Sequence, residues 1–476
     1  MNVLIISTYI LALVGIGILG RRRSHTKEEF RVAGRRLGPV LYTGSLCALV
    51  LGGASTIGGV SLGYTQGLAG MWLVVSIALG VILLSLFFAP IITRFNLYTV
   101  SQVLSARYGS VLTSRLASVV MLAYTMMIAV TSTTAYASIF RVLFGLESSW
   151  AILLGASVVI LYSMLGGMWA ITLTDMLQFI IMTLGIFCLL LPLSLSQAGG
   201  WAGLTSRLDS HFFDPTSLGM PSLLTMFVLY TLGQLSGQVI WQRVFTARSA
   251  RVARIGGSVA GIYVALYGLA GAIIGMSARV LEPNLAKPDD AFAILAQNYL
   301  PAGLGGIVLA AGVAAMMSTA SGTLIAASTL MRVDIVPIFR RKASPDLGQE
   351  SVLADRIYLL ILGTLATVLA LVMTDTVTAL RLAYNILIGG LLVAILGGLI
   401  WRRGTGLGAT ASIVAGSAAV LLGIFKYGVS ANQPIYIGLA ASLLVYVLVS
   451  LLSPATDKKV LESWLAASQT KTKSLD

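Results

Sequence analysis

The chain of 476 residues is 57% hydrophobic and only 10% charged, with a mean hydropathy of +0.93. Soluble domains average about 25% charged residues, so this composition excludes a soluble globular protein and indicates one that crosses a membrane many times. The net charge of +14 does not indicate a nucleic-acid-binding protein, because the basic residues lie in short connections between apolar runs instead of on one soluble face.

Thirteen apolar runs are long enough to form membrane-spanning helices, since about 20 residues cross the hydrocarbon core. The first run lacks a charged start and a small-residue cleavage site, so we expect a retained helix and not a signal peptide. The chain is therefore predicted to be an all-α integral membrane protein. The predicted spans cover residues 2–20, 39–61, 70–93, 117–141, 149–165, 171–195, 222–242, 255–278, 305–330, 357–374, 379–401, 408–426 and 434–453.

The basic residues alternate between the two sides of these spans. All but six of the 31 Lys and Arg lie in the connections after spans 1, 3, 7, 9 and 11 or in the C-terminal tail; the six are Arg141, Arg207, Arg279, Lys287, Arg381 and Lys426. By the positive-inside rule the richer side is cytoplasmic. This predicts a multi-pass protein of the cell membrane with its N-terminus outside and its C-terminus in the cytoplasm, which agrees with an odd number of spans.

Two of the predicted spans are interrupted by glycine. The second contains the run GGASTIGG at 52–59, and the seventh contains LGQLSGQ at 232–238. Broken helices at membrane depth form cation and substrate sites in secondary transporters, although small residues also permit close helix packing. Because the two breaks lie five spans apart, the pattern favours an inverted repeat of five helices.

This repeat divides the chain into five parts. A first helix with a basic loop covers 1–38, and the two halves of the repeat cover 39–195 and 196–401. Two C-terminal helices cover 402–453, and a cytoplasmic tail covers 454–476.

The ninth span carries a row of hydroxyl groups. Ala315, Ser318 and Thr319 stand at positions i, i+3 and i+4 and share one helical face, which Ser321 extends by one turn. Hydroxyl and carbonyl oxygens are ligands for hard cations such as sodium. The hydroxyls can instead bond back to their own helix, so the pattern alone leaves both interpretations open.

One acid lies inside a predicted span. Asp175 sits about one turn into the sixth span, whereas the other acids lie in connections or at span ends. An intramembrane carboxylate is costly and is a functional candidate by default. The alternative is a structural pair with a cytoplasmic arginine such as Arg243.

Taken together, several motifs resemble the sodium/solute symporter family, whose members carry sugars, proline, pantothenate, sialic acid, choline or monocarboxylates. The motifs appear in the expected order along most of the chain. They are FRVAGRRLG at 30–38, GGMW at 166–169, TDMLQ at 174–178, QVIWQR at 238–243, the serine-rich ninth span and RVDI at 332–335.

The resemblance implies a LeuT-type fold with a sodium site between the second and ninth helices. Matched residue by residue, that site would use the backbone carbonyls of Ala48, Leu51 and Ala315 and the hydroxyls of Ser318 and Thr319. Some members have a second cation site, for which Asp175 and Ser321 match. Gly322 stands where a further serine is often found, which argues against a second sodium.

The resemblance also implies where the solute sits. The expected residues are Gly52, Gly53, Ser55 and Thr56 at the first break, Gln234, Ser236 and Gln238 at the second, and Tyr384 and Asn385 in the eleventh span. None is an acid or a base, so a neutral, zwitterionic or small anionic solute fits better than a cation. The proline-type branch has an aspartate where this chain has Val50, which argues against close kinship with that branch.

The sequence therefore predicts sodium-coupled symport of a small organic solute by alternating access. Proton coupling through Asp175 is the first alternative, and a non-transporting membrane sensor of the same fold is the second. We expect no enzyme activity, because the spans hold no nucleophile–histidine or metal-ligand constellation. We also expect no organic cofactor, no nucleic acid and no obligatory protein partner.

Overall fold

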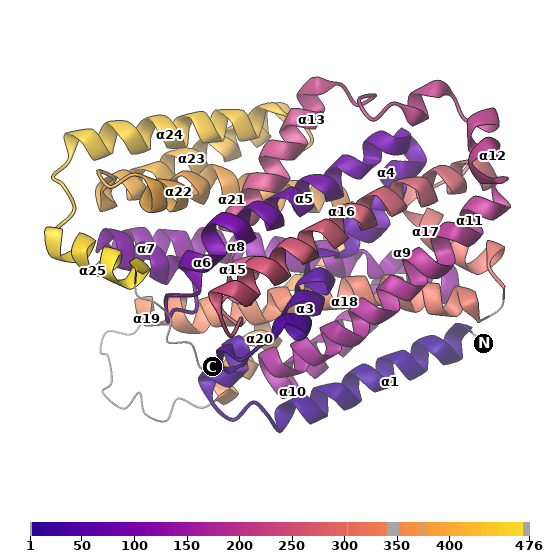
Figure 1. The fold of residues 1–476 in the computed structure, drawn as a ribbon, viewed down its shortest axis with the longest axis horizontal. Coiled ribbons are helices and arrows are strands. Elements are labelled where there is room, and N and C mark those ends of the chain that lie inside the picture. Colours follow the sequence, from indigo (N-terminus) through magenta and orange to yellow (C-terminus); the bar gives the residue numbers. More distant parts are fainter. Residues whose placement is uncertain (1, 302, 340–351, 374, 470–476) are drawn as a thin grey trace.

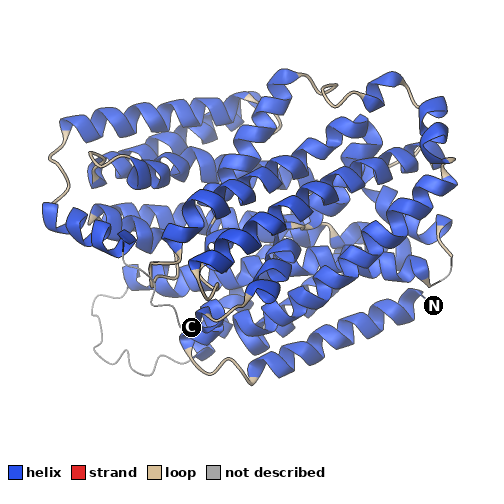
Figure 2. Ribbon diagram, viewed as in Figure 1, coloured by secondary structure: helices blue, strands red, loops and turns tan. Residues whose placement is uncertain are grey.

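The computed structural model describes residues 2–301, 303–339, 352–373 and 375–469. In these ranges helices are the only regular structure apart from one isolated β-bridge between Leu37 and Ala247, and loops connect them (Figure 2). Parts of two predicted cytoplasmic segments, 340–351 and 470–476, lie outside the described residues.

The helices of the first half, in chain order, are α1 (Asn2–Arg21), α2 (Lys27–Val32), α3 (Pro39–Val50), α4 (Gly59–Gln66), α5 (Trp72–Leu83), α6 (Ala89–Ile92), α7 (Val100–Tyr108), α8 (Val111–Thr134), α9 (Tyr136–Phe144), α10 (Ser148–Thr183), α11 (Leu191–Gln197) and α12 (Gly200–Arg207). Those of the second half are α13 (Met220–Met226), α14 (Leu232–Ser236), α15 (Gln238–Val244), α16 (Ala250–Leu281), α17 (Ala291–Ile294), α18 (Leu304–Leu330), α19 (Val336–Phe339), α20 (Val352–Val372), α21 (Thr376–Leu387), α22 (Val393–Ile400), α23 (Gly406–Tyr427), α24 (Gln433–Leu452) and α25 (Lys458–Gln469).

Ten helical stretches in the described chain are long and apolar enough to cross a membrane, and one bent pair raises the count to as many as eleven. One stretch, Ser148–Gln197, has 50 residues. A straight helix of that length would measure roughly 75 Å, more than twice a hydrocarbon core of about 30 Å. It is interrupted at Gly167, whose positive φ of 55° is not helical. The predicted number of thirteen spans is not confirmed by this count and stays a prediction.

The outer surface of the helix bundle is apolar. Large hydrophobic side chains such as Leu11 of α1, Ile262 of α16 and Phe425 of α23 are exposed, the last of them by 92%. A soluble monomer rarely carries so continuous an apolar surface, and a lipid-facing surface requires it. The long helices run side by side, with the N-terminus and α25 at opposite ends of the bundle (Figure 1).

Helix α18 lies in the interior of the bundle, where it packs against α1, α3, α8, α10 and α20. Its residues from Val308 to Leu330 are all buried, which suits a helix with small side chains on every face. Both predicted helix breaks are confirmed. α3 ends at Val50 and the chain resumes helical structure at Ala54, while α14 and α15 are bent by 48° at Gly237.

Candidate functional site

The end of α3 meets the hydroxyl face of α18. Ser318 Oγ donates to the carbonyl of Ala48 at 2.7 Å and lies 2.9 Å from the carbonyl of Ala315, and Thr319 Oγ1 donates to the carbonyl of Leu49 at 2.5 Å. Four of the five predicted sodium ligands, together with Leu49, are thus gathered at one point. The fifth, Leu51, lies at the break itself (φ −91°, ψ 68°) and shares no hydrogen bond with these hydroxyls in the described chain.

Glycine permits this close approach of the two helices. A Cβ atom on Gly52 would lie 2.8 Å from Thr319 Oγ1 and 3.0 Å from Thr319 Cβ, which is too close for a side chain. On its other side, a Cβ atom on Gly53 would lie 2.5 Å from the Cβ of Ala135. The glycine pair is therefore required by packing as well as by the break.

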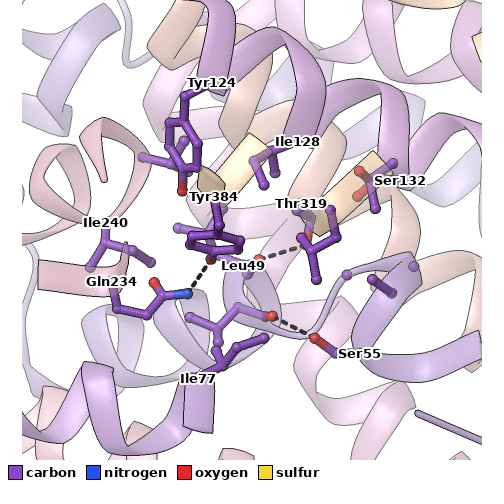
Figure 3. Close-up of a pocket in the computed structure, with 17 residues that line it drawn as sticks. Leu49, Ser55, Ile77, Tyr124, Ile128, Ser132, Gln234, Ile240, Thr319 and Tyr384 are labelled. Carbon is purple, nitrogen blue, oxygen red and sulfur yellow. Dashed lines mark hydrogen bonds between the residues drawn. The ribbon is translucent and has the colours of Figure 1, made fainter. Parts of the chain in front are cut away.

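A small cavity of about 40 Å³ lies beside the break (Figure 3). Small-molecule sites usually measure roughly 300–1,000 Å³, so the walls must move apart before a solute fits. Thr319 belongs to both regions, because it lines the cavity and contacts the end of α3. Among the described residues the cavity wall contains no charged side chain. The wall is formed by Leu49, Val50, Gly52, Gly53, Ala54, Ser55, Ile77, Tyr124, Ile128, Thr131, Ser132, Gln234, Val239, Ile240, Thr319, Leu380 and Tyr384.

Polar groups meet at one end of the cavity, where Gln234 Nε2 donates to Tyr384 Oη at 2.5 Å (Figure 3). The ring of Tyr384 packs edge-on against the ring of Tyr124, with centroids 5.6 Å apart. Gln234 Oε1 and Ser132 Oγ are buried without a hydrogen-bond partner in the described chain. Buried polar atoms are nearly always paired, so these two are available to a ligand.

Four predicted solute residues do not line the cavity. Thr56 Oγ1 lies 3.1 Å from the hydroxyl of Tyr267, and the hydroxyl of Ser236 bonds back to its own helix. The amide of Asn385 donates to the carbonyl of Arg381.

Gln238, the fourth of these residues, points toward the loop before α7. Its Oε1 accepts from the N–H of Val100 at 2.9 Å and its Nε2 donates to the carbonyl of Tyr98 at 3.0 Å. Both polar ends of the side chain are thus occupied by backbone, one in the loop and one at the first residue of α7.

The sequence prediction missed the contribution of α8. Tyr124, Ile128, Thr131 and Ser132 all come from this helix and form one side of the cavity. The run TSTT at 131–134, polar in an otherwise apolar span, is the signal that could have indicated them.

Asp175 is paired with Arg243, as one of the two interpretations expected. Its Oδ2 accepts from Arg243 Nη2 at 2.6 Å and from Ser45 Oγ at 2.8 Å, and both charged side chains are at most 2% exposed. Its Oδ1 has no hydrogen-bond partner in the described part of the chain. The hydroxyl of Ser321 donates to the carbonyl of Ser318.

Two broken membrane helices beside an uncharged cavity, with carbonyls and hydroxyls gathered at one break, define a secondary transporter. Comparison with known proteins agrees. A family model described as the sodium:solute symporter family matches residues 30–416, and the chain belongs to that family. It is a sodium-coupled solute symporter that works by alternating access.

Sodium/proline symporters from several strains of Staphylococcus aureus, among them JH9 and Mu3, are 26% identical over 447 residues, which is 88% of this chain and 85% of theirs. In structure, the chain resembles a Na⁺-coupled sialic acid symporter in a substrate-bound outward-open state, with a TM-score of 0.84 at 19% identity over 96% of this chain and 98% of that one. A nucleobase-cation-symport-1 family transporter in a closed conformation gives 0.57 at 15% identity, over 91% and 97%. These likenesses show the LeuT-type fold.

Proposed function

We propose that the sodium ion binds between the end of α3 and α18, and that the solute binds in the adjoining cavity. The observation that supports this most directly is the position of Thr319, whose hydroxyl contacts the broken end of α3 while its side chain lines the cavity. The oxygens around it are carbonyls and hydroxyls, which suit a hard cation. Because one residue belongs to both sites, binding at each site affects binding at the other.

We propose a small neutral or zwitterionic solute. The wall provides no formal charge to balance a net ionic group, so polar contacts and the dipoles of the half-helices would orient the molecule. Gln234 Oε1 needs a donor, which an N–H or O–H group of the solute would supply, and Ser132 Oγ would bind an acceptor. Apolar contact would come from the rings of Tyr124 and Tyr384 and from Ile77 and Ile128.

L-Proline belongs to this chemical class and is the solute named for the curated relatives. An identity of 26% does not by itself carry the substrate across. The side chain of Val50, where the proline-type branch has an acid, lines the cavity directly and makes that part of the wall apolar.

The orientation and repeat boundaries are part of the proposal. The N-terminus would lie outside and the C-terminus in the cytoplasm, with repeat halves at 39–195 and 196–401. The support for the orientation is the excess of Lys and Arg on one side of the predicted spans. The support for the repeat is the position of the two breaks, at α3 in the first half and at the α14–α15 bend in the second. An inverted repeat places such breaks together near the middle of the membrane.

The test is a thermal-shift screen of the purified protein against amino acids, sugars, organic acids and vitamins, with sodium chloride or with potassium chloride, at each of two pH values. We expect a neutral or zwitterionic compound to raise the melting temperature only when sodium is present. Stabilisation that follows pH instead of sodium would favour proton coupling. If a cationic compound stabilises the protein without sodium, both the proposed site and the proposed solute class are contradicted.

A further inference from the structure

A carboxylate buried among membrane helices needs a countercharge. In an apolar interior the charge of Asp175 must be balanced by a proton, a bound cation or a cationic side chain. Which of the three is present decides how many cations the protein takes from solution in each transport cycle.

The countercharge of Asp175 is Arg243. The guanidinium Nη2 lies 2.6 Å from Asp175 Oδ2, and Nη1 lies near Met168 Sδ and Thr172 Oγ1. Arg243 stands on α15, six residues beyond the break at Gly237. It therefore reaches Asp175 from the second repeat half while Asp175 lies in the first.

Arg243 packs against α18 at Gly322. A Cβ atom on Gly322 of α18 would lie 2.3 Å from Leu49 Cδ1 and 3.5 Å from Arg243 Nη2. The guanidinium thus contacts α18 at position 322, next in sequence to Ser321, and glycine supplies no side-chain ligand there.

A second pair in the molecule follows the same rule. Asp355 and Asp175 are the two fully buried carboxylates among the described residues, and Asp355 accepts two hydrogen bonds from Arg31, at 3.0 and 3.1 Å. Both acids are balanced by an arginine distant in sequence. The protein thus supplies its own cation at each buried carboxylate.

We propose that Arg243 is a built-in countercation for Asp175, so that the protein binds one sodium ion per transport cycle, at the α3–α18 site. This rests on the proposed sodium site. With a neutral or zwitterionic solute, each cycle then moves one positive charge across the membrane.

The experiment measures ²²Na⁺ binding to the purified protein in detergent at pH 8, without any solute. We expect one sodium per folded molecule and a Hill coefficient of 1. A count of two would overturn the inference and would place a cation on the free carboxylate oxygen, Oδ1. If no sodium binds, the proposed sodium site fails, which is a separate outcome.

Variants of the pair test the role of the guanidinium directly. In Arg243→Gln the carboxylate loses its countercharge, and we expect bound sodium to rise from one towards two per folded molecule. In the double variant Asp175→Asn/Arg243→Gln both charges are absent, so the count should return to one. A folded Arg243→Gln protein that still binds a single sodium would contradict the role of Arg243 as a countercation.

The double variant also covers loss of folding in the single variants, since it leaves no unpaired charge. The matched control is the other pair, as Arg31→Gln/Asp355→Asn, which should leave the count at one. A change in this control would show that the counts report general damage and would overturn the assignment.

Discussion

The two broken helices of this transporter use the same interruption for different purposes. At the α3 break, the carbonyls of Ala48 and Leu49 turn inward and meet the hydroxyls of Ser318 and Thr319. At the α14–α15 break, the side chain of Gln238 turns away from the cavity and bonds to the backbone of Tyr98 and Val100. At the proposed sodium site the first break would present backbone oxygens to the ion, whereas the second break is tied to the loop before α7.

We infer from this difference that the first break serves binding and that the second, through Gln238, controls access to the cavity. Gln234, one turn before the second break, faces the cavity, whereas Gln238, one residue beyond it, holds the loop. The cavity and the loop are thus joined through a single bent helix pair. A change in the bend would alter the solute contacts and the loop contacts at the same time.

The largest expected effect tests whether the second break lies in a membrane span at all. Single cysteines at Ser210 and Arg251, on either side of α13–α15, should label from opposite sides of the membrane in a protein lacking Cys47 and Cys188. We expect all-or-none labelling by an impermeant maleimide, with Ser210→Cys reacting from outside and Arg251→Cys from the cytoplasm. Labelling of both from one side would remove the span and the comparison with it.

The second-largest effect is expected when the proposed sodium ligands are changed. Thr319→Val keeps the shape of the side chain and removes the hydroxyl, and Ser318→Ala removes the other. A hydrogen bond or contact with a charged partner contributes roughly 1.5–3 kcal/mol, so sodium affinity should fall roughly 10- to 150-fold. The measurement is the sodium concentration that gives half-maximal uptake or half-maximal thermal stabilisation. A high sodium concentration should restore uptake.

Ser328 provides the control for these variants. It lies on α18, is buried, and its hydroxyl bonds to its own helix at Ile325. Ser328→Ala should leave the sodium curve unchanged. If Thr319→Val and Ser318→Ala behave like this control, the ion does not bind at the first break.

Gln238→Leu should change access to the cavity. The variant removes two hydrogen bonds of about 1 kcal/mol each. The equilibrium between the conformation that holds this contact and one in which it is broken should therefore shift roughly 30-fold toward the second. We expect a cysteine at Val239, which lines the cavity, to react correspondingly faster from the loop side. Gln178→Leu is the control, because Gln178 is also buried but bonds to Tyr9 on α1. Equal labelling rates in the two variants would mean that Gln238 does not control access to the cavity.

Sequence patterns predicted the parts of the site that depend on local structure. The glycine runs at 52–59 and 232–238 indicated both breaks, and the spacing of Ser318 and Thr319 indicated their common face. The direction of Gln238 could not be predicted, because it depends on how α15 is rotated after Gly237 and on the loop that packs there. The pairing of Asp175 with Arg243 joins residues 68 positions apart, and spacing alone could only name it as an alternative.

Tyr384→Phe should have the smallest effect, confined to the solute. The hydroxyl of Tyr384 accepts from Gln234 Nε2, and phenylalanine keeps the ring contact with Tyr124 while it removes this acceptor. A neutral hydrogen bond contributes about 0.5–1.5 kcal/mol, so the solute KM should change by roughly 2- to 12-fold. Sodium affinity without solute should stay at the wild-type value, because in the described chain the hydroxyl of Tyr384 bonds to Gln234 and not to the α3–α18 site. Tyr136→Phe is the control, since this buried hydroxyl has no hydrogen-bond partner in the described chain and does not line the cavity. If Tyr384→Phe changes solute-free sodium affinity instead of KM, then Gln234 and Tyr384 belong to the ion site, and the division of roles between the two breaks would have to be reversed.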